Sequence, residues 1–266
     1  MDGRTRCALD SFRAERTGSM QLRDATLLLV DDEPILLEIE TEWFSGLASQ
    51  VLTANNGAEA IKLLETCSVD VILTDVRMPV LDGITMLTTL RRMRRAVPSV
   101  VFLSSYTSIS VREVFDLGAE AIMSKPTTRQ DLVYKVEKVL MDKRVVWSEP
   151  YWGVTAHNVN QGFASIAESI ADGKLAFGRG GFCIHGSLTF SGEVTDLALD
   201  FKVDRKRLIG KGIARWQEHT EEKIGIEIIY LEDSCRDWVF AITQRETGVF
   251  IPRDTSRIGV PVLLQS

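Results

Sequence analysis

The stretch VILTDVRMPVLDG, residues 71–83, decides the fold because a buried strand ends in it on a carboxylate. Its first three residues form an apolar run that predicts a core strand, and Asp75 closes the run. A turn at Asp82 and Gly83 precedes the next helical pattern. Because a lone carboxylate is costly to bury, the strand is expected to deliver Asp75 to a sheet edge where its charge has a use.

Apolar runs alternate with amphipathic helical patterns between Ala25 and Arg144. Strands are predicted at 27–30, 50–54, 69–75, 99–105 and 120–126, and helices from Pro34 to Phe44 and at 58–65, 84–95, 110–118 and 128–144. Continuous apolar strands separated by helices indicate a parallel sheet covered on both faces. With right-handed crossovers, the fold class is an α/β doubly wound, five-stranded parallel sheet.

Polar residues gather where these strands end. Asp31 and Asp32 follow the first strand, Asp75 ends the third, Ser104 the fourth and Lys125 the fifth. Ligands bind at the carboxyl ends of strands in such sheets. Three neighbouring carboxylates repel one another, and a hard cation such as Mg²⁺ with oxygen ligands removes that penalty. Mg²⁺ also suits phosphoryl chemistry, in which an aspartate can be the nucleophile.

Residues 25–144 resemble the receiver domain of two-component response regulators. The motifs VDDEP, TDVRMPVLDG, FLSSY and SKP carry the resemblance, in the expected order and at strand ends. The resemblance implies that Asp75 accepts a phosphoryl group from a sensor histidine kinase or phosphotransfer protein. Asp31, Asp32 and Asp75, with the backbone carbonyl of Arg77, would bind Mg²⁺.

The resemblance also assigns the residues that would hold the phosphoryl group. Ser104 would hydrogen-bond a phosphoryl oxygen, and Lys125 would pair with the phosphoryl group. In this family, the peptide bond that corresponds to Lys125–Pro126 is commonly cis. Ile122 stands where the family usually has Tyr or Phe, so the usual aromatic switch is not available. Such a protein is a phosphoacceptor and not an enzyme, beyond self-catalysed phosphotransfer and dephosphorylation.

The pattern changes after Arg144. Residues 145–160 contain Pro150, Gly153 and three aromatic side chains and indicate a linker or docking segment. A helix at 163–171, strands at 180–190, 194–203, 207–217 and 223–231, and a helix at 235–246 predict a mainly antiparallel β-barrel domain with flanking helices over residues 161–266. Residues 1–24 are polar and arginine-rich and predict a flexible tail.

Residues 176–246 resemble, more weakly, a PilZ domain, the cyclic di-GMP receptor module. The resemblance rests on GGFCI, SGEVTDLALDF, GKGIARW and KIGIEIIYLEDSCRDWV. That family binds its dinucleotide with an R-x-x-x-R pair and a D/N-x-S-x-x-G motif, because two guanidinium groups fork onto two phosphates.

Both halves of that ligand motif are missing here. No arginine lies between Val145 and Gly178, and Ala176 and Gly178 stand where the acid and serine belong. We therefore expect the fold without a cyclic di-GMP site, and an output domain that acts on a downstream protein by direct contact. The alternative is a cyclic di-GMP effector that integrates phosphorylation with second-messenger binding.

Composition narrows the remaining classes. A net charge of −6 argues against a surface that binds duplex DNA. The arginine run RRMRR at 91–95 suits a solvated helix face, and no helix-turn-helix pattern follows the receiver-like part. We therefore do not expect DNA as a partner. Without a membrane-length apolar run or signal-peptide core, we expect a cytoplasmic protein without membrane insertion. Four scattered cysteines, at 7, 67, 183 and 235, predict free thiols. The sequence leaves a homodimer or higher oligomer open.

The helix predicted at 128–144 runs directly into the aromatic segment that includes Trp147, Tyr151 and Trp152. Because disordered linkers are poor in aromatic residues, we expect this segment to dock on one or both domains, or on a second protomer, and to hold their orientation. The alternative is that the aromatic side chains only complete the core of the second domain.

Overall fold

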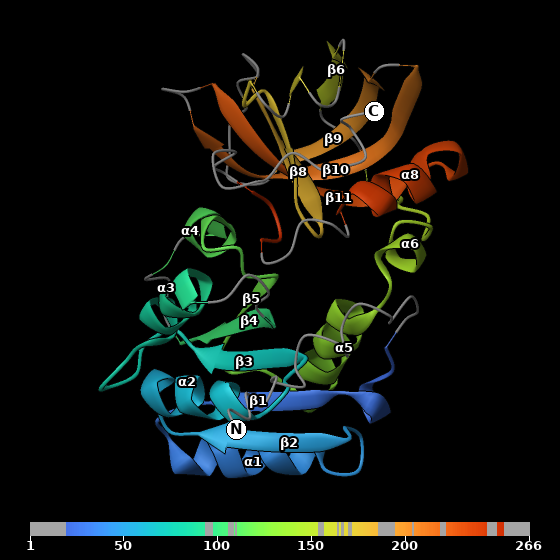
Figure 1. Cartoon of the computed structure of the whole chain (residues 1–266). Coiled ribbons are helices and arrows are strands. Elements are labelled where there is room, and N and C mark those ends of the chain that lie inside the picture. The colour runs from blue at the N-terminus through green and yellow to red at the C-terminus, as the bar shows by residue number, and fades with distance from the viewer. Residues whose placement is uncertain are drawn as a thin grey trace, which may run out of the picture.

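The computed structural model contains two β-sheets, joined by a short helical segment (Figure 1). It describes residues 20–93, 98–105, 109, 111–153, 157–163, 165, 168–169, 172–185, 195–203, 205–218, 222–243 and 249–252. Most of the predicted N-terminal tail, Arg94 and Arg95 of the arginine run, and Cys7 lie outside these residues.

The first sheet has five parallel strands in the order β2-β1-β3-β4-β5. These strands are β1 (Thr26–Val30), β2 (Gln50–Ala54), β3 (Val71–Asp75), β4 (Ser99–Ser104) and β5 (Ala121–Ser124). The helices between and after them are α1 (Pro34–Phe44), α2 (Gly57–Thr66), α3 (Gly83–Met93), α4 (Val111–Asp116) and α5 (Arg129–Leu140). The predicted doubly wound sheet is confirmed.

The two faces of this sheet bury separate apolar clusters. Leu28 of β1 packs with residues of α2, α3 and α4 on one face, whereas Leu27 and Leu29 pack with residues of α1 and α5 on the other. This follows from strand geometry, because successive side chains point to opposite faces. Strands buried on both sides therefore need the continuous apolar runs seen in the sequence.

Helix starts in this domain follow capping chemistry. The Asn56 side chain accepts hydrogen bonds from the backbone N–H groups of Ala58 and Glu59 and begins α2. Thr128 accepts one from the backbone N–H of Asp131 and begins α5. Such caps satisfy N–H groups that have no partner inside the helix.

The single helix predicted at 128–144 is wrong. Helix α5 ends at Leu140, and a second helix, α6 (Lys143–Val146), follows it. The cause is Asp142, whose carboxylate accepts the backbone N–H of Arg144 at 2.8 Å and so caps a new helix. After the break, α6 packs against α8 of the second domain (Figure 1).

The end of the predicted N-terminal tail is ordered structure. Residues Leu22–Asp24 form a short 3₁₀ helix, η1, and Leu22 is buried against the first sheet's core. The predicted tail therefore ends earlier than residue 24.

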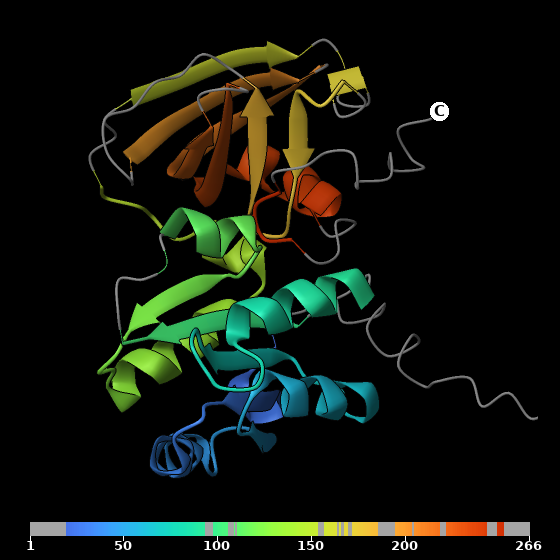
Figure 2. The same cartoon turned by 90° about the vertical axis from the view of Figure 1, so that its left-hand side faces the viewer.

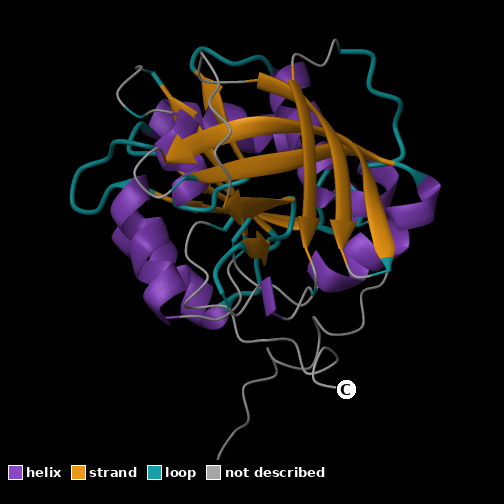
Figure 3. Cartoon of the chain, turned by 90° about the horizontal axis from the view of Figure 1, so that it is seen from above, coloured by secondary structure: helices purple, strands orange, loops and turns teal. Residues whose placement is uncertain are grey.

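The second sheet has six strands in the order β6-β9-β10-β11-β8-β7. They are β6 (His157–Phe163), β7 (Leu175–Phe177), β8 (Gly181–His185), β9 (Thr195–Val203), β10 (Lys206–Glu218) and β11 (Lys223–Leu231), with helix α8 (Asp233–Thr243) after them. All neighbours pair antiparallel except β6 and β9, which are parallel. Figure 3 shows the curvature of its long strands from above.

The described pairings of this sheet do not show a closed barrel. Strands β6 and β7 stand at the two ends of the order, and no pairing joins them among the described strands. The prediction of a mainly antiparallel sheet is confirmed, whereas the prediction that this sheet closes into a barrel is not.

The first strand of the second sheet differs from the sequence prediction. β6 begins at His157, inside the predicted linker of 145–160, and ends at Phe163, where a helix was predicted to begin. Helical hydrogen bonds come later, from the N–H of Ser169 to the carbonyl of Ser165 and from Asp172 to Glu168. The sequence HNVNQGF is polar apart from Val159 and Phe163, as suits an edge strand, and this hides it from a search for apolar runs.

The segment after α6 belongs to the second core. Trp147 is 1% exposed and packs edge-on to Phe240, with ring centroids 6.4 Å apart. Its carbonyl accepts the backbone N–H of Leu231 at 2.9 Å. Trp152, in contrast, is 88% exposed. Trp147 therefore does what the alternative expected, by completing the second domain's core, whereas Trp152 does not pack on either domain.

Candidate functional site: the acidic edge of the first sheet

Three aspartates meet at the carboxyl end of the first sheet. Asp31 and Asp32 directly follow β1, and Asp75 is the last residue of the neighbouring strand β3. One carboxylate oxygen of each lies within 4.8 Å of the other two. Asp31 is buried and Asp32 is exposed. The parallel register of β1 and β3 thus produces the convergence that the sequence predicted.

Lys125 enters the same cluster from the end of β5. Its Nζ lies 2.5 Å from Oδ2 of Asp31 and 2.9 Å from Oδ2 of Asp75. Burial opposes the charge of this ammonium, but its hydrogen bonds with Asp31 and Asp75 outweigh that and raise the pKa of Lys125 above its ordinary value. The lysine is therefore held charged at the centre of the site.

Backbone groups fix the aspartate side chains. Oδ1 of Asp31 accepts the N–H of Glu33 at 2.8 Å, and Oδ1 of Asp75 accepts the N–H of Arg77 at 3.2 Å. Gly83 packs so closely on this turn that a Cβ there would lie 2.3 Å from the carbonyl oxygen of Asp75. A side chain at position 83 would push the turn away from Asp75, which accounts for glycine in VLDG.

The other predicted site residues lie around the cluster. Ser104 ends β4 and is buried, and its carbonyl accepts the backbone N–H of Lys125 at 2.8 Å. The Lys125–Pro126 peptide bond is cis, as the resemblance implied. Ile122 packs, partly buried, against the apolar cluster under α2, α3 and α4.

Sequence reasoning missed Glu40. This residue of α1 is buried, 5% exposed, with the neighbouring apolar positions Leu37 and Phe44. Burial, followed by the charges of Asp31 and Asp75, raises its pKa from 4.5 to about 7, and Lys125 opposes the rise. The available signal was its position, because residues 37, 40 and 44 share one helix face by 3.6-residue periodicity.

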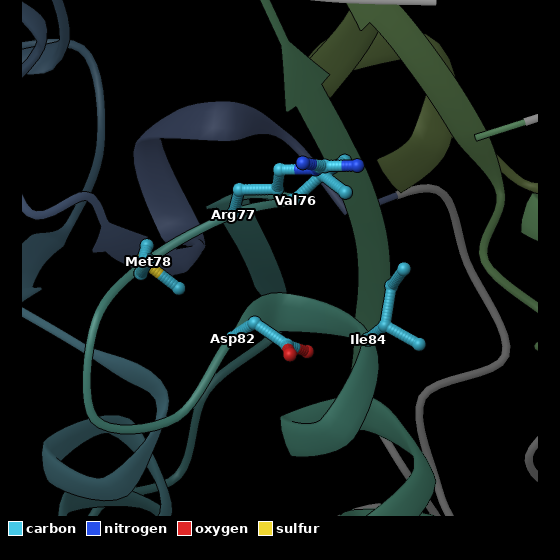
Figure 4. A pocket seen from close by; sticks show the side chains of 5 residues that line it. All are labelled: Val76, Arg77, Met78, Asp82 and Ile84. Carbon is cyan, nitrogen blue, oxygen red and sulfur yellow. The ribbon is translucent and has the colours of Figure 1, made fainter. Parts of the chain in front are cut away.

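A cleft of ≈ 450 Å³ lies along the turn after β3. Val76, Arg77, Met78, Asp82 and Ile84 line it, and Figure 4 shows their side chains around the turn. Two of the lining residues, Val76 and Arg77, directly follow Asp75 in the sequence.

The donor set fits a hard divalent cation. The three aspartates supply only oxygen ligands, and Lys125 offsets one of their three negative charges. Mg²⁺ prefers carboxylate oxygens and keeps several of its waters, which suits a cluster with one exposed member. The acidic group is typical of the Mg²⁺ site of receiver domains.

Comparisons with known proteins agree with this geometry. Residues 27–137 match the family model of the response regulator receiver domain. The chain is 34% identical over 122 residues to the positive alginate biosynthesis regulatory protein of Pseudomonas aeruginosa, covering 45% of this chain and 48% of that protein. It is 36% identical over 151 residues to the transcriptional regulatory protein PrrA of Mycobacterium leprae, covering 56% of this chain and 57% of that one. The chain thus spans about half the length of these curated relatives.

Among solved structures, the receiver domain of the Francisella response regulator 1452 is 27% identical, with a TM-score of 0.40 over 44% of this chain and 97% of that one. No family model matches the second domain.

The N-terminal part of the chain is therefore a response regulator receiver domain. Receiver domains are phosphoacceptor modules of two-component signalling. No helix in the described part of the chain is long and apolar enough to cross a membrane.

Proposed function

We propose that this chain is a response regulator that a histidine kinase or phosphotransfer protein phosphorylates on Asp75. The observation that carries the proposal is the environment of Asp75. Its side chain is 13% exposed, accessible at the sheet edge, and Lys125 and the Arg77 N–H hold its two oxygens. The acid is therefore both oriented and reachable.

The chemistry assigns each group a role. A carboxylate oxygen of Asp75 attacks phosphorus, an O–P bond forms, and the P–N bond to the donor histidine breaks. Lys125 then pairs with the phosphoryl oxygens, and Ser104 donates its hydroxyl hydrogen to one of them. Mg²⁺, held by Asp31, Asp32, Asp75 and the Arg77 backbone carbonyl, would neutralise charge on the transferring group. The chain supplies orientation and charge, which is most of what phosphoryl transfer requires.

The test is labelling by acetyl phosphate with Mg²⁺, read by intact-protein mass spectrometry. Asp75→Asn should abolish labelling while the fold survives, because the amide keeps the shape but is a poor nucleophile. Asp82→Asn is the matched control, since Asp82 lies on the same loop and caps α3 through the N–H of Thr85. Labelling that persists in Asp75→Asn at another residue would overturn the assignment.

For output, we propose that the second domain acts by contact with a downstream protein. The PilZ resemblance has no matching family model behind it, and the sheet is not shown to close. The arginine pair and the acid–serine motif that would bind cyclic di-GMP are missing from the sequence. Guanidinium groups are the residues of choice for bidentate phosphate binding, so their loss supports a protein-contact role.

Calorimetric titration with cyclic di-GMP, with and without beryllofluoride as phosphoryl mimic, tests this proposal. We expect no saturable binding at micromolar concentrations in either state. A clear isotherm would overturn the protein-contact role in favour of a cyclic di-GMP effector.

A further inference from the structure

The last described segment of the chain, residues 249–252, lies against the turn between β7 and β8. Figure 1 and Figure 2 show this segment in red, between the second sheet and the first domain. Its residues form neither helix nor strand, yet Phe250 is 3% exposed and Ile251 is 0% exposed. The segment is therefore held by contacts with the surface under it, and not by a regular element of its own.

Backbone hydrogen bonds set the path of this segment. The N–H of Arg179, in the turn, donates to the carbonyl of Val249 at 3.0 Å. The next N–H along the turn, that of Gly180, donates to the carbonyl of Phe250, also at 3.0 Å. Consecutive main-chain donors of this kind recognise an extended backbone whatever its side chains are, which is the chemistry by which many domains bind peptides.

Two glycines of the turn leave the space that the segment fills. A Cβ at Gly178 would lie 2.6 Å from the carbonyl oxygen of Phe250 and 2.7 Å from Cδ of Pro252. A Cβ at Gly180 would overlap the ring of Phe250. Neither glycine has a positive φ, so the close approach of the segment, and not the conformation of the turn, accounts for glycine at both positions. The turn is thus shaped to receive a peptide.

Two pockets of different chemistry receive the side chains of the segment. The ring of Phe250 faces Lys143 of α6, whose Nζ lies 5.2 Å from the ring centroid, and this position of an ammonium group favours an aromatic side chain. The same ring lies 5.8 Å, between centroids, from that of Phe115, which closes this side of the pocket. Ile251 is buried in an apolar cluster, which favours an aliphatic side chain. The second-sheet members of that cluster are Ala176, Cys183 and Trp216.

We propose that this groove is a peptide-binding site and that residues 249–252 are its occupant within the chain. The downstream protein binds there by presenting an extended segment with an aromatic residue, an aliphatic residue and a proline in that order, in place of the chain's own segment. That a downstream protein exists at all rests on the proposed function.

The chain's own segment has the properties of an exchangeable ligand. Its backbone is tied to the turn through the carbonyls of Val249 and Phe250, and such a short contact opens at a lower free energy than the sheet that it covers. Residues 244–248 tether it to α8. A competing peptide must therefore overcome an effective concentration on the order of millimolar, which a partner that also contacts the surrounding surface can do.

A fluorescent peptide of sequence GVFIPRD, residues 248–254, is the probe, titrated against the full chain by fluorescence anisotropy. The tethered segment competes in the unaltered chain, so binding should be weak. Phe250→Ala in the chain weakens the competitor and should raise peptide affinity by roughly tenfold or more. Adding Gly180→Ala fills the groove and should abolish this gain. Adding Gly162→Ala is the matched control, because a Cβ there meets nothing closer than 4.0 Å, and should preserve it.

The peptide tests the same pockets from the other side. The change Phe250→Ala made in the peptide should remove its binding to the Phe250→Ala chain, and so should Ile251→Asp made in the peptide. Unchanged binding of either altered peptide would overturn the assignment of the pockets, because a site that reads only the backbone does not distinguish these sequences.

The remaining outcomes separate a peptide site from a structural contact. Equal peptide affinity in the unaltered and Phe250→Ala chains, or affinity that survives Gly180→Ala, would overturn the site and leave the segment as a fixed part of the domain. If Phe250→Ala fails to fold, Phe250→Leu keeps most of the apolar volume and should still raise peptide affinity several-fold. No increase in Phe250→Leu would also contradict the proposal.

Light scattering tests the other possible occupant, the same segment of a second copy. The unaltered chain should have the same mass as Gly180→Ala. A dimer that Gly180→Ala converts into a monomer would assign the groove to a second copy of the chain, and the downstream peptide would be wrong.

Failure of this site is distinguishable from failure of the proposed function. If acetyl phosphate does not label Asp75, or if cyclic di-GMP binds, the proposed function is wrong, and the peptide titration still decides whether the groove binds peptides. If Asp75 is labelled and cyclic di-GMP does not bind, but the peptide binds none of the variants, only the peptide site is wrong.

Discussion

The two ends of the receiver sheet carry opposite imbalances of charge. At the carboxyl end, Asp31, Asp32 and Asp75 surround one ammonium, that of Lys125. At the amino end, one carboxylate, that of Glu120, meets cations from α6 and from the second domain. The same five strands therefore hold two different kinds of charge cluster. The carboxyl end has an excess of carboxylates typical of a Mg²⁺ site, and the amino end has a carboxylate whose cations come from the chain.

The largest effect is expected where the acidic end loses the ammonium group of Lys125. Lys125→Met leaves the carboxylates uncompensated and should lower the free energy of unfolding by about 2–4 kcal/mol in metal-free buffer, because breaking a buried ion pair leaves an unpaired charge. Millimolar Mg²⁺ should restore much of it. Urea unfolding with and without Mg²⁺ measures both, with Lys62→Met as an exposed control. A loss that Mg²⁺ does not reduce would break the comparison.

Glu40 sharpens the comparison by adding a fourth acid near the carboxyl end. Because its pKa is about 7 in the folded chain and 4.5 when unperturbed, the folded state binds the extra proton between these values. Stability should therefore fall as pH rises from about 4.5 to 7 and stay low above that range.

Glu40→Gln should remove this pH dependence and stabilise the chain by about 1–3 kcal/mol at pH 8 in metal-free buffer. Urea unfolding of both proteins at several pH values measures it. If the free energy of unfolding depends on pH in the same way for both proteins, Glu40 does not titrate between about pH 4.5 and 7.

Asp32 is the exposed member of the cluster, so its substitution should change Mg²⁺ affinity more than the free energy of unfolding. Asp32→Asn should weaken Mg²⁺ binding tenfold or more, about 1.4 kcal/mol, because affinity follows the charge of the ligands. The free energy of unfolding without metal should change by less than about 0.5 kcal/mol. Calorimetry with Mg²⁺ measures the first quantity. Undiminished Mg²⁺ affinity would mean that the acid pair is structural.

The smallest effect concerns the amino end. Ser99→Ala removes the 2.5 Å hydrogen bond from the serine hydroxyl to Glu120 and should lower the free energy of unfolding by about 1 kcal/mol. Mg²⁺ should not reduce this loss, because the amino end takes its cations from the chain. Urea unfolding with and without Mg²⁺ decides it, and rescue by Mg²⁺ would erase the distinction between the two ends.

Local rules made the receiver predictable from sequence. Its strands are continuous apolar runs, and Asp31, Asp75 and Lys125 stand at their ends, so parallel topology alone brings them together. The second domain was harder because β6 is a polar edge strand and β7 has only three residues. Closure of a sheet into a barrel depends on pairings between distant segments, which no local pattern specifies.

Glu40 and Glu120 escaped prediction for one shared reason. Each is an ordinary acid in sequence, and its importance comes from neighbours far along the chain. Arg179 lies 59 positions beyond Glu120, from the numbers of the two residues in the pair. The break at Met141 was missed because a cap at Asp142 competes with an otherwise good helical pattern.

The short helix α6 determines where this protein could be divided and recombined. Trp147 directly follows α6 and lies in the core of the second domain, while α5 ends at Leu140, which packs against the core of the first. A chimera that transplants the output module onto another receiver should therefore be joined near Met141. A junction at residue 161 would cut β6 in two and leave the tryptophan behind, so the transplanted module would arrive with a hole in its interior.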